Sequence, residues 1–155
     1  MKVSIYNDVI SDPESHVLDI VKEGFIDVQL GKDLFKNVQE RDVDKVSMFL
    51  NKEYPLYSVA LNFARRSPLN QIEPNYIHTD DMMGDLTAIL YLNSKPDSRD
   101  GTTIYLGKKG KRVIKSKFNK MVVFPSHLEH SRNILENYGE GEEARLIQVL
   151  FLKKI

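Results

Sequence analysis

Two histidines and one aspartate are spaced as the ligands of a metal ion would be. His78 and Asp80 stand two residues apart at the end of a segment expected to be a strand, residues 75–79. Side chains at positions i and i+2 of a strand project to the same side, so these two groups should lie together. One carboxylate and two imidazoles form the facial set that holds non-haem Fe(II) and leaves coordination positions open. The second imidazole must come from elsewhere in the chain.

The candidates for that ligand are His127 and His130, in the segment Phe-Pro-Ser-His-Leu-Glu-His at 124–130. His130 should share one side of a strand with Leu128, whereas His127 should point the other way and is expected to be a turn or rim residue. With 4 histidines and 22 acidic residues, roughly half of one His-x-acid pair is expected by chance. The pair alone is therefore weak evidence for a metal site, and the prediction depends on the order of the elements around it.

The elements that must position these residues are short strands after Pro55. Tyr57, Val59, Leu61 and Phe63 alternate with small or polar residues, which is typical of a half-buried strand. Turn-forming residues separate most of the later candidates. The expected strands are 57–64, 75–79, 86–92, 102–106, 111–115, 121–124, 128–134 and 144–152. About eight short strands is the number in a double-sheet jelly roll, where strands distant in sequence meet at one end.

The first 54 residues are expected to support that core mainly with helices. Asp12 should cap a helix that ends at Gly24, and a second short helix should follow Asp42 or Asp44. Short strands are expected at 2–5 and 25–30. His16 lies in the first helix and is expected at its solvated surface.

Composition bounds the class of protein. The 155 residues carry 22 basic and 22 acidic side chains, a balance that gives no pull toward nucleic acid or an anionic membrane. The absence of cysteine excludes disulfides, thiolate metal ligands and cysteine nucleophiles. No apolar run approaches the ~18 residues of a membrane span, and the first ten residues do not form a signal peptide. We expect a cytoplasmic single domain, 1–155, of class α+β, mainly β. Its double-stranded β-helix core (jelly roll, cupin-like) should span 55–155, with 1–54 as support.

Several short motifs, taken in order, resemble one enzyme family. They are His78-x-Asp80, Leu90-Tyr91-Leu92-Asn93, Gly101-Thr102, Val123-Phe124-Pro125-Ser126, His130 and Arg145. Together they resemble the 2-oxoglutarate- and Fe(II)-dependent oxygenases, specifically the prolyl-4-hydroxylase-like branch, over residues 57–152. The resemblance implies a dioxygenase that uses Fe(II), 2-oxoglutarate and O2. Such an enzyme hydroxylates an unactivated C–H bond, with a prolyl residue as the favoured substrate, and releases succinate and CO2.

The resemblance also implies roles for individual residues. His78, Asp80 and His130 would ligate iron and act in catalysis through it, and His130 is preferred to His127 because the family's distal histidine follows the Phe-Pro-Ser segment after a few residues. Arg145 would pair with the distal carboxylate of 2-oxoglutarate, because its planar guanidinium matches a carboxylate. The acidic stretch 136–143 before it is longer than expected for the family, so Arg132 stays an alternative for this role, as His127 does for His130.

Further residues are assigned to the cosubstrate and the substrate. Tyr91 would hydrogen-bond the same distal carboxylate, and Asn62, on the polar side of the first core strand, could also reach the cosubstrate. Ile147 stands where many relatives have a serine or threonine that binds this carboxylate. Met82 and Met83 follow the metal motif directly and would line the substrate entrance, although adaptable core filling is an equal reading of two methionines.

Two other functions stay open. A cupin-like non-redox metalloenzyme using Zn(II) or Mn(II) would usually carry a second histidine at the position of Asp80. A non-catalytic jelly-roll binding module would have lost its metal. The expected partner is a small molecule or a protein side chain, with no membrane and no nucleic acid, and the oligomeric state is left open. A run of basic residues at 108–120 is read as a solvated hairpin whose charges protect a sheet edge, in preference to a polyanion contact.

Overall fold

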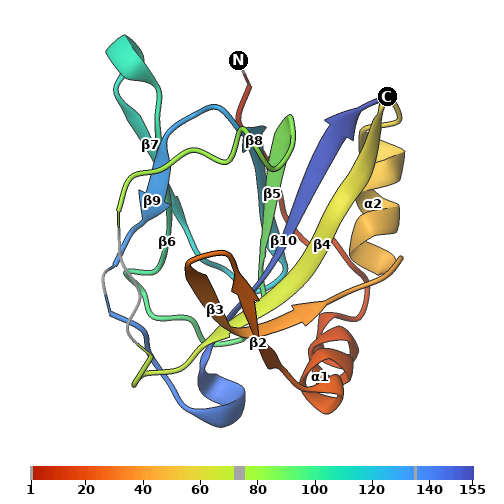
Figure 1. Ribbon diagram of the computed structural model, residues 1–155, viewed down its shortest axis with the longest axis vertical. Coiled ribbons are helices and arrows are strands. Elements are labelled where there is room, and N and C mark those ends of the chain that lie inside the picture. Colours follow the sequence, from red (N-terminus) through yellow and green to blue (C-terminus); the bar gives the residue numbers. More distant parts are fainter. Residues whose placement is uncertain (1, 72–75, 135) are drawn as a thin grey trace.

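The computed structural model of the protein describes residues 2–71, 76–134 and 136–155. Within these residues, two helices and ten strands build two facing antiparallel sheets (Figure 1). Neither of the two helices is long and apolar enough to cross a membrane.

The two helices begin where aspartates can cap them. Helix α1 (Pro13–Glu23) follows Asp12, whose carboxylate accepts a hydrogen bond from the backbone N–H three residues later. Helix α2 (Lys45–Glu53) follows Asp44, whose carboxylate accepts from the backbone of the second and third helical residues. Such caps satisfy N–H groups that have no partner inside a helix. Both predicted helices are confirmed, and the cap of the second is Asp44.

Ten strands form the two sheets. The large sheet has the order β1-β8-β5-β10-β4-β3-β2, and the small sheet has the order β7-β6-β9. The strands are β1 (Ser4–Tyr6), β2 (Ile26–Leu30), β3 (Asp33–Glu40), β4 (Tyr57–Ser67), β5 (Leu86–Tyr91), β6 (Gly101–Tyr105), β7 (Lys111–Lys115), β8 (Lys120–Pro125), β9 (His130–Arg132) and β10 (Arg145–Lys154); two 3-10 turns are η1 (Gly107–Lys109) and η2 (Gly141–Glu143). Neighbours in each sheet are antiparallel and mostly distant in sequence, as expected for a jelly roll. The mainly-β fold is confirmed.

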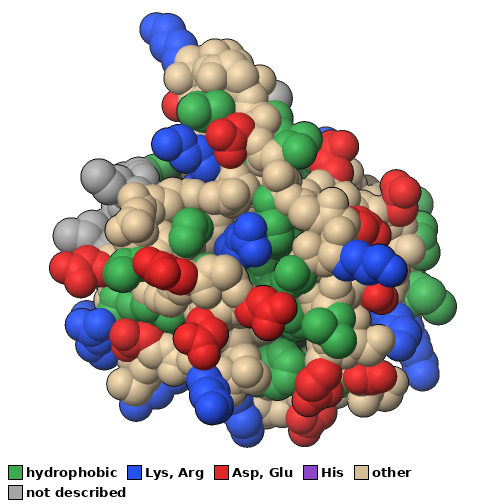
Figure 2. All heavy atoms as spheres, turned by 90° about the horizontal axis from the view of Figure 1, so that it is seen from below, with side chains coloured by type: hydrophobic (Ala, Val, Ile, Leu, Met, Phe, Trp, Pro, Cys, Tyr) green, Lys and Arg blue, Asp and Glu red, His purple; other side chains and the backbone are tan. Residues whose placement is uncertain are grey.

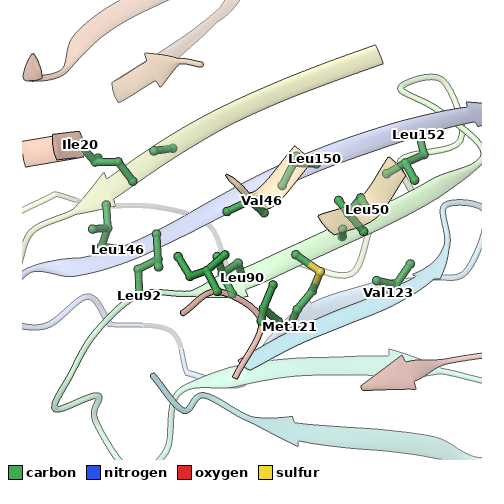
Figure 3. Packing of buried hydrophobic residues seen from close by; sticks show 14 residues of the cluster. Ile20, Val46, Leu50, Leu90, Leu92, Met121, Val123, Leu146, Leu150 and Leu152 are labelled. Atoms are coloured by element: carbon green, nitrogen blue, oxygen red, sulfur yellow. The ribbon is translucent and has the colours of Figure 1, made fainter. Parts of the chain in front are cut away.

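The large sheet is covered on both faces. Its helix-facing side carries one hydrophobic cluster, in which Ile20 of α1 and Leu50 of α2 pack with Leu90 and Leu150 of the sheet (Figure 3). Its other side meets the small sheet through a second cluster that includes Phe124. Alternate residues of β10 belong to the two clusters in turn. Because a strand points successive side chains to opposite faces, each residue of β10 is assigned to the helix side or to the space between the sheets.

The N-terminal region is less helical than predicted. Strands β1, β2 and β3 all join the large sheet, and β3 is absent from the sequence prediction. Most of the β3 side chains are exposed, so they carry no burial pattern, and Asn37 has a positive φ of 55° within the strand. The predicted strand 75–79 begins outside the described residues, and in its described part only a single bridge forms, between His78 and His130.

His16 is buried, contrary to the prediction that it lies at a solvated surface. Its Nε2 lies 2.7 Å from Oε1 of Gln148, a fully buried residue of β10. The amide of Gln148 donates to Asp44 Oδ2 and to Asn62 Oδ1 at 2.8 and 2.7 Å. Burial would raise the pKa of Asp44, but hydrogen bonds from the backbone of its helix and from Arg41 and Gln148 lower it below its ordinary value. A polar network therefore ties both helices to the sheet.

Candidate metal centre

The three predicted ligand residues come together at one end of the space between the sheets. His130 Nε2 lies 3.0 Å from Asp80 Oδ2, and His78 Nε2 lies 3.6 Å from Asp80 Oδ1. One ligand atom from each residue can be chosen so that all lie within 4.8 Å of one another. Two ligand atoms about 2.1 Å from a metal ion and at right angles to each other are about 3 Å apart. The separations of 3.0 and 3.6 Å from the carboxylate are close to this distance, so small side-chain adjustments would bring all three groups onto one ion.

Backbone hydrogen bonds hold the three ligands in this arrangement. His78 and His130 form an antiparallel bridge in which each backbone N–H donates to the carbonyl of the other, at 3.0 and 2.9 Å. The N–H of Asp80 donates to the carbonyl of Ser126 at 2.9 Å. The ring of Phe124 lies edge-on to that of His130, with 4.8 Å between the ring centres. The small sheet and the segment after β8 thus fix the site from two sides.

The hydrogen bonds of the two imidazoles indicate which nitrogen is available. Nδ1 of His78 lies 3.3 Å from the carbonyl oxygen of Tyr76, and Nδ1 of His130 lies 3.1 Å from that of Leu128. A carbonyl can only accept, so Nδ1 of each ring carries the proton. In a neutral ring the lone pair is then on Nε2, the atom nearest Asp80. A backbone acceptor on the far nitrogen is the usual support for a metal-bound histidine.

The donor set fits a divalent transition metal. Two neutral imidazoles and one carboxylate suit Fe(II), and three protein ligands leave positions for other molecules. His130 is buried and His78 is partly exposed, so the set faces both the interior and solvent. The alternative ligand His127 is exposed and does not belong to the cluster. Of the two histidines considered from the sequence, the structure brings His130 to the site.

A buried ion pair lies at the start of β10. Nε of Arg145 donates to both carboxylate oxygens of Asp100 at 3.1 Å, and both residues are buried. The side-chain hydrogen bonds from Arg145 to the described residues all use Nε. Asp100 also accepts from the Tyr138 hydroxyl at 2.8 Å and from the backbone of Gly101 at 2.7 Å. Burial, followed by the charge of Asp100, raises the pKa of Tyr138, so this hydroxyl keeps its proton.

The hydroxyl of Tyr91 joins the two sheets beside this pair. Tyr91 is fully buried on β5, and its hydroxyl oxygen lies 2.6 Å from Oγ1 of Thr102 on β6. Burial raises the pKa of Tyr91, while the Thr102 hydrogen bond and the charge of Arg145 act in the opposite direction. The Tyr91 hydroxyl is therefore protonated and lies close enough to Arg145 to interact electrostatically with it.

Asn62 does not reach this space, so the prediction that it binds the cosubstrate is wrong. Its side chain lies on the helix side of β4, where its amide donates to the carbonyl of Asp42 at 3.0 Å and its oxygen accepts from Gln148. The neighbouring residue Phe63 packs into the cluster between the sheets. Strand β4 has the helices on one face and the space between the sheets on the other. The polar residue Asn62 faces the helices.

The remaining candidates lie around the site. Arg132 is two residues after His130 on β9, so both side chains share one face of the small sheet; its Nη2 donates to Asn137 Oδ1 at 2.7 Å. Met82 is 93% exposed and Met83 37% exposed, so neither is core filling. Asp100 and Tyr138 were not predicted from the sequence. Asp100 directly precedes the Gly101-Thr102 motif, which is the only signal that could have singled it out among 22 acidic residues.

Comparisons with known proteins support the fold. No family model matches the sequence, and no curated protein matches it. A solved oxidoreductase of the 2OG-Fe(II) oxygenase family from Burkholderia pseudomallei is similar over 97% of this chain and 84% of its own, with 11% identity and a TM-score of 0.67. A viral collagen prolyl hydroxylase from Paramecium bursaria Chlorella virus 1 is similar over 100% and 90%, with 16% identity and a TM-score of 0.64.

A third solved structure widens the chemistry associated with this fold. The non-haem alpha-ketoglutarate-dependent epimerase of nogalamycin biosynthesis is similar over 96% of this chain and 76% of its own, with 11% identity and a TM-score of 0.64. The chain therefore has the fold of the 2OG-Fe(II) oxygenases, as its motifs predict. Because proteins of this fold include a hydroxylase and an epimerase, the reaction has to be argued from the site.

Proposed function

We propose that this protein is an Fe(II)- and 2-oxoglutarate-dependent dioxygenase that hydroxylates an unactivated C–H bond. The observation that carries the proposal is the meeting of His78, Asp80 and His130, with both Nε2 atoms toward the carboxylate. Bound Fe(II) would supply the activation of O2 that is coupled to decarboxylation of 2-oxoglutarate to succinate and CO2. The chain's own residues hold the metal, bind the cosubstrate and exclude water.

Arg145 is the residue best placed to bind the distal carboxylate of 2-oxoglutarate. It lies on the inter-sheet face of β10, near Tyr91, and Asp100 holds it through Nε. The two Nη atoms of Arg145 can then form a bidentate interaction with a carboxylate. The neutral hydroxyl of Tyr91 adds a donor beside it, which supports the assignment made from the family resemblance. Arg132 remains the alternative.

The walls around His130 are apolar, which suits chemistry that water would disturb. Phe124, Leu128 and Ile104 are buried around His130, and all three belong to the inter-sheet cluster. A dry site protects a strong oxidant from side reactions. On the open side, Met82 and Met83 follow Asp80 and are exposed, so we assign them to the substrate entrance. A prolyl residue is the favoured substrate, supported by the similarity of the fold to a prolyl hydroxylase.

The test compares two histidines that are close in sequence and differ in the proposed role. Fe(II) binding and 2-oxoglutarate-dependent succinate formation are measured for the wild type, His130→Ala and His127→Ala. We expect the wild type and His127→Ala to bind one Fe(II) and to form succinate only with O2, and His130→Ala to lose both properties. Equal metal binding by the two variants, or turnover that needs no O2, would reject the proposal; the second result would favour a cupin-like non-redox enzyme.

A further inference from the structure

One continuous segment of the chain holds no acidic residue. Residues 101–128 contain seven basic side chains and no aspartate or glutamate, which leaves 15 of the 22 basic and all 22 acidic residues for the rest of the chain. The seven are Lys108, Lys109, Lys111, Arg112, Lys115, Lys117 and Lys120. A protein with no net charge thus concentrates positive charge on β6, β7, β8 and their connections. We call these seven residues the basic surface.

The charges of the basic surface are exposed and uncompensated. Six of the seven side chains are exposed, and Lys120 is half-buried. Among the described residues, none of the seven lies within 4.0 Å of a carboxylate oxygen. Burial, then the like charges of Lys117 and Arg112, lowers the pKa of Lys120. Close like charges without counter-charges destabilise the folded state, so their accumulation here requires an explanation.

The face at the other end of the molecule is different. Figure 2 views the molecule from below the orientation of Figure 1, away from the turn at 107–110, and shows acidic and basic side chains interspersed. The segregation of positive charge therefore does not extend to that face (Figure 2).

The basic surface begins next to the metal centre. Ile104 of β6 is the direct partner of His130 on one side and of Arg112 on the other. With neighbouring strands about 4.8 Å apart, Arg112 and His130 are about 10 Å apart across the sheet. The side chain of Arg112 is on the same face of the small sheet as His130, whereas Lys111 and Lys115 point to the opposite face. The hairpin continues through Lys111 to the turn with Lys108 and Lys109, which stands out from the body in Figure 1.

Protection of a sheet edge explains only part of this charge. Strand β7 is an edge of the small sheet, and lysines on an edge strand keep it from pairing with other chains. That reason covers Lys111 and Lys115, which lie on β7. It does not cover Lys108 and Lys109 in the turn, or Lys117 beyond the strand.

We propose that the substrate is a protein and that the basic surface binds an acidic segment of it. A residue next to that segment in the substrate then reaches the metal centre. The inference rests on the proposed oxygenase function and names its class of substrate. Lys111 and Lys115 are four residues apart on one strand, about 13 Å at 3.3 Å per residue. A small anion cannot span that distance, but an extended peptide with several acidic residues can.

The surface lacks the features that favour nucleic acid. Base stacking needs exposed aromatic rings, whereas the aromatic residues here are Phe118, which is half-buried, and Tyr105, whose hydroxyl pairs with Ser131. Flexible lysines without stacking partners suit carboxylates along a peptide.

The test measures peptide binding without metal or cosubstrate. Fluorescence anisotropy follows a labelled twelve-residue peptide of alternating glutamate and glycine, the same peptide with glutamine for glutamate, and a twelve-residue oligothymidylate. The proteins are the wild type, a triple variant with Lys108, Lys111 and Lys115 each changed to glutamate, and a matched control with Lys22, Lys32 and Lys52 changed to glutamate. The control lysines are exposed and lie on α1, the β2–β3 turn and α2.

We expect the wild type and the control to bind the glutamate peptide, the triple variant to bind about tenfold or more weakly, and added salt to weaken binding. Equal affinity of the triple variant and the control would overturn the inference. Tighter wild-type binding of the oligothymidylate than of the peptide would overturn the polypeptide assignment. The peptide assay contains no iron, so its failure can be told apart from failure of the proposed function. If the peptide does not bind but the protein forms succinate, only this inference is rejected. If the peptide binds but the protein does not bind iron, the oxygenase function is rejected.

Discussion

The buried pair of Asp100 and Arg145 offers a sharp test of how the cosubstrate pocket is built. Asp100→Asn keeps the shape of the side chain but only one of its two acceptor oxygens, so the hydrogen bond from the Gly101 backbone or the one from the Tyr138 hydroxyl can be accepted, and not both. It removes the negative charge that faces Arg145, which is itself 5% exposed. The guanidinium is then buried without a counter-charge.

The expected cost follows from the burial of both partners. Removing one partner of a buried ion pair costs about 3–5 kcal/mol, because the remaining charge loses its compensation. Because the side-chain shape and one acceptor oxygen are kept, we expect Asp100→Asn at the lower end, a loss of about 3 kcal/mol in the free energy of unfolding. Adding Arg145→Met removes the unpaired charge, so the double variant should be more stable than Asp100→Asn alone.

Urea unfolding at neutral pH, followed by circular dichroism, measures these free energies. Asp97→Asn is the matched control, because Asp97 pairs with the exposed Arg99 at 2.9 Å and water already screens that pair. We expect the control to stay close to the wild type. A loss below about 1 kcal/mol for Asp100→Asn, or a double variant less stable than the single one, would refute the claim that Asp100 compensates a buried Arg145.

Three further predictions concern Asp44 in the polar network between the helices and the sheet, Gly101 at the start of β6, and Tyr91 beside the proposed cosubstrate site. The folded pKa of Asp44 is below its unfolded value, so its stabilising effect is present above roughly pH 4 and is lost as the pH falls further; the difference in unfolding free energy between wild type and Asp44→Asn should shrink from pH 7 to pH 3. Gly101→Ala should cost at least about 2 kcal/mol in urea unfolding, because Gly101 has a φ of 147° and an added Cβ would lie 1.9 Å from the Ile114 carbonyl oxygen. Tyr91→Phe should raise the KM for 2-oxoglutarate in a succinate assay with little change in Fe(II) affinity, and an unchanged KM would remove Tyr91 from the pocket.

Local and periodic signals predicted much of this structure. The aspartate caps of α1 and α2 act within four residues, so the sequence carries them directly. The i, i+2 rule predicted that His78 and Asp80 lie together, and the position of His130 after the Phe-Pro-Ser segment, as in the family that the sequence resembles, preferred it to His127; the structure brings these three residues to one place. The predicted strand at 75–79 is reduced to one bridge, and it is this bridge between His78 and His130 that holds the two imidazoles together.

The failures depend on contacts between distant segments. Asn62 lies on a strand covered on both faces, so alternation could not tell the helix side from the inter-sheet side. His16 looked like a surface residue because its partner, Gln148, is 132 positions away. Asp100 looked like one loop acid among many, and only the fold places it against Arg145. Strand β3 is mostly exposed and leaves no apolar pattern.

The most direct test of the metal centre is an anaerobic titration of the protein with Fe(II) and 2-oxoglutarate, followed by visible absorbance. We predict a charge-transfer band that requires both components, is retained in His127→Ala and is absent in Asp80→Ala. No band in the wild type, with Zn(II) or Mn(II) bound at the same residues instead, would contradict the oxygenase assignment and leave only a metal site of another function. A band that persists in Asp80→Ala would contradict the ligand assignment itself.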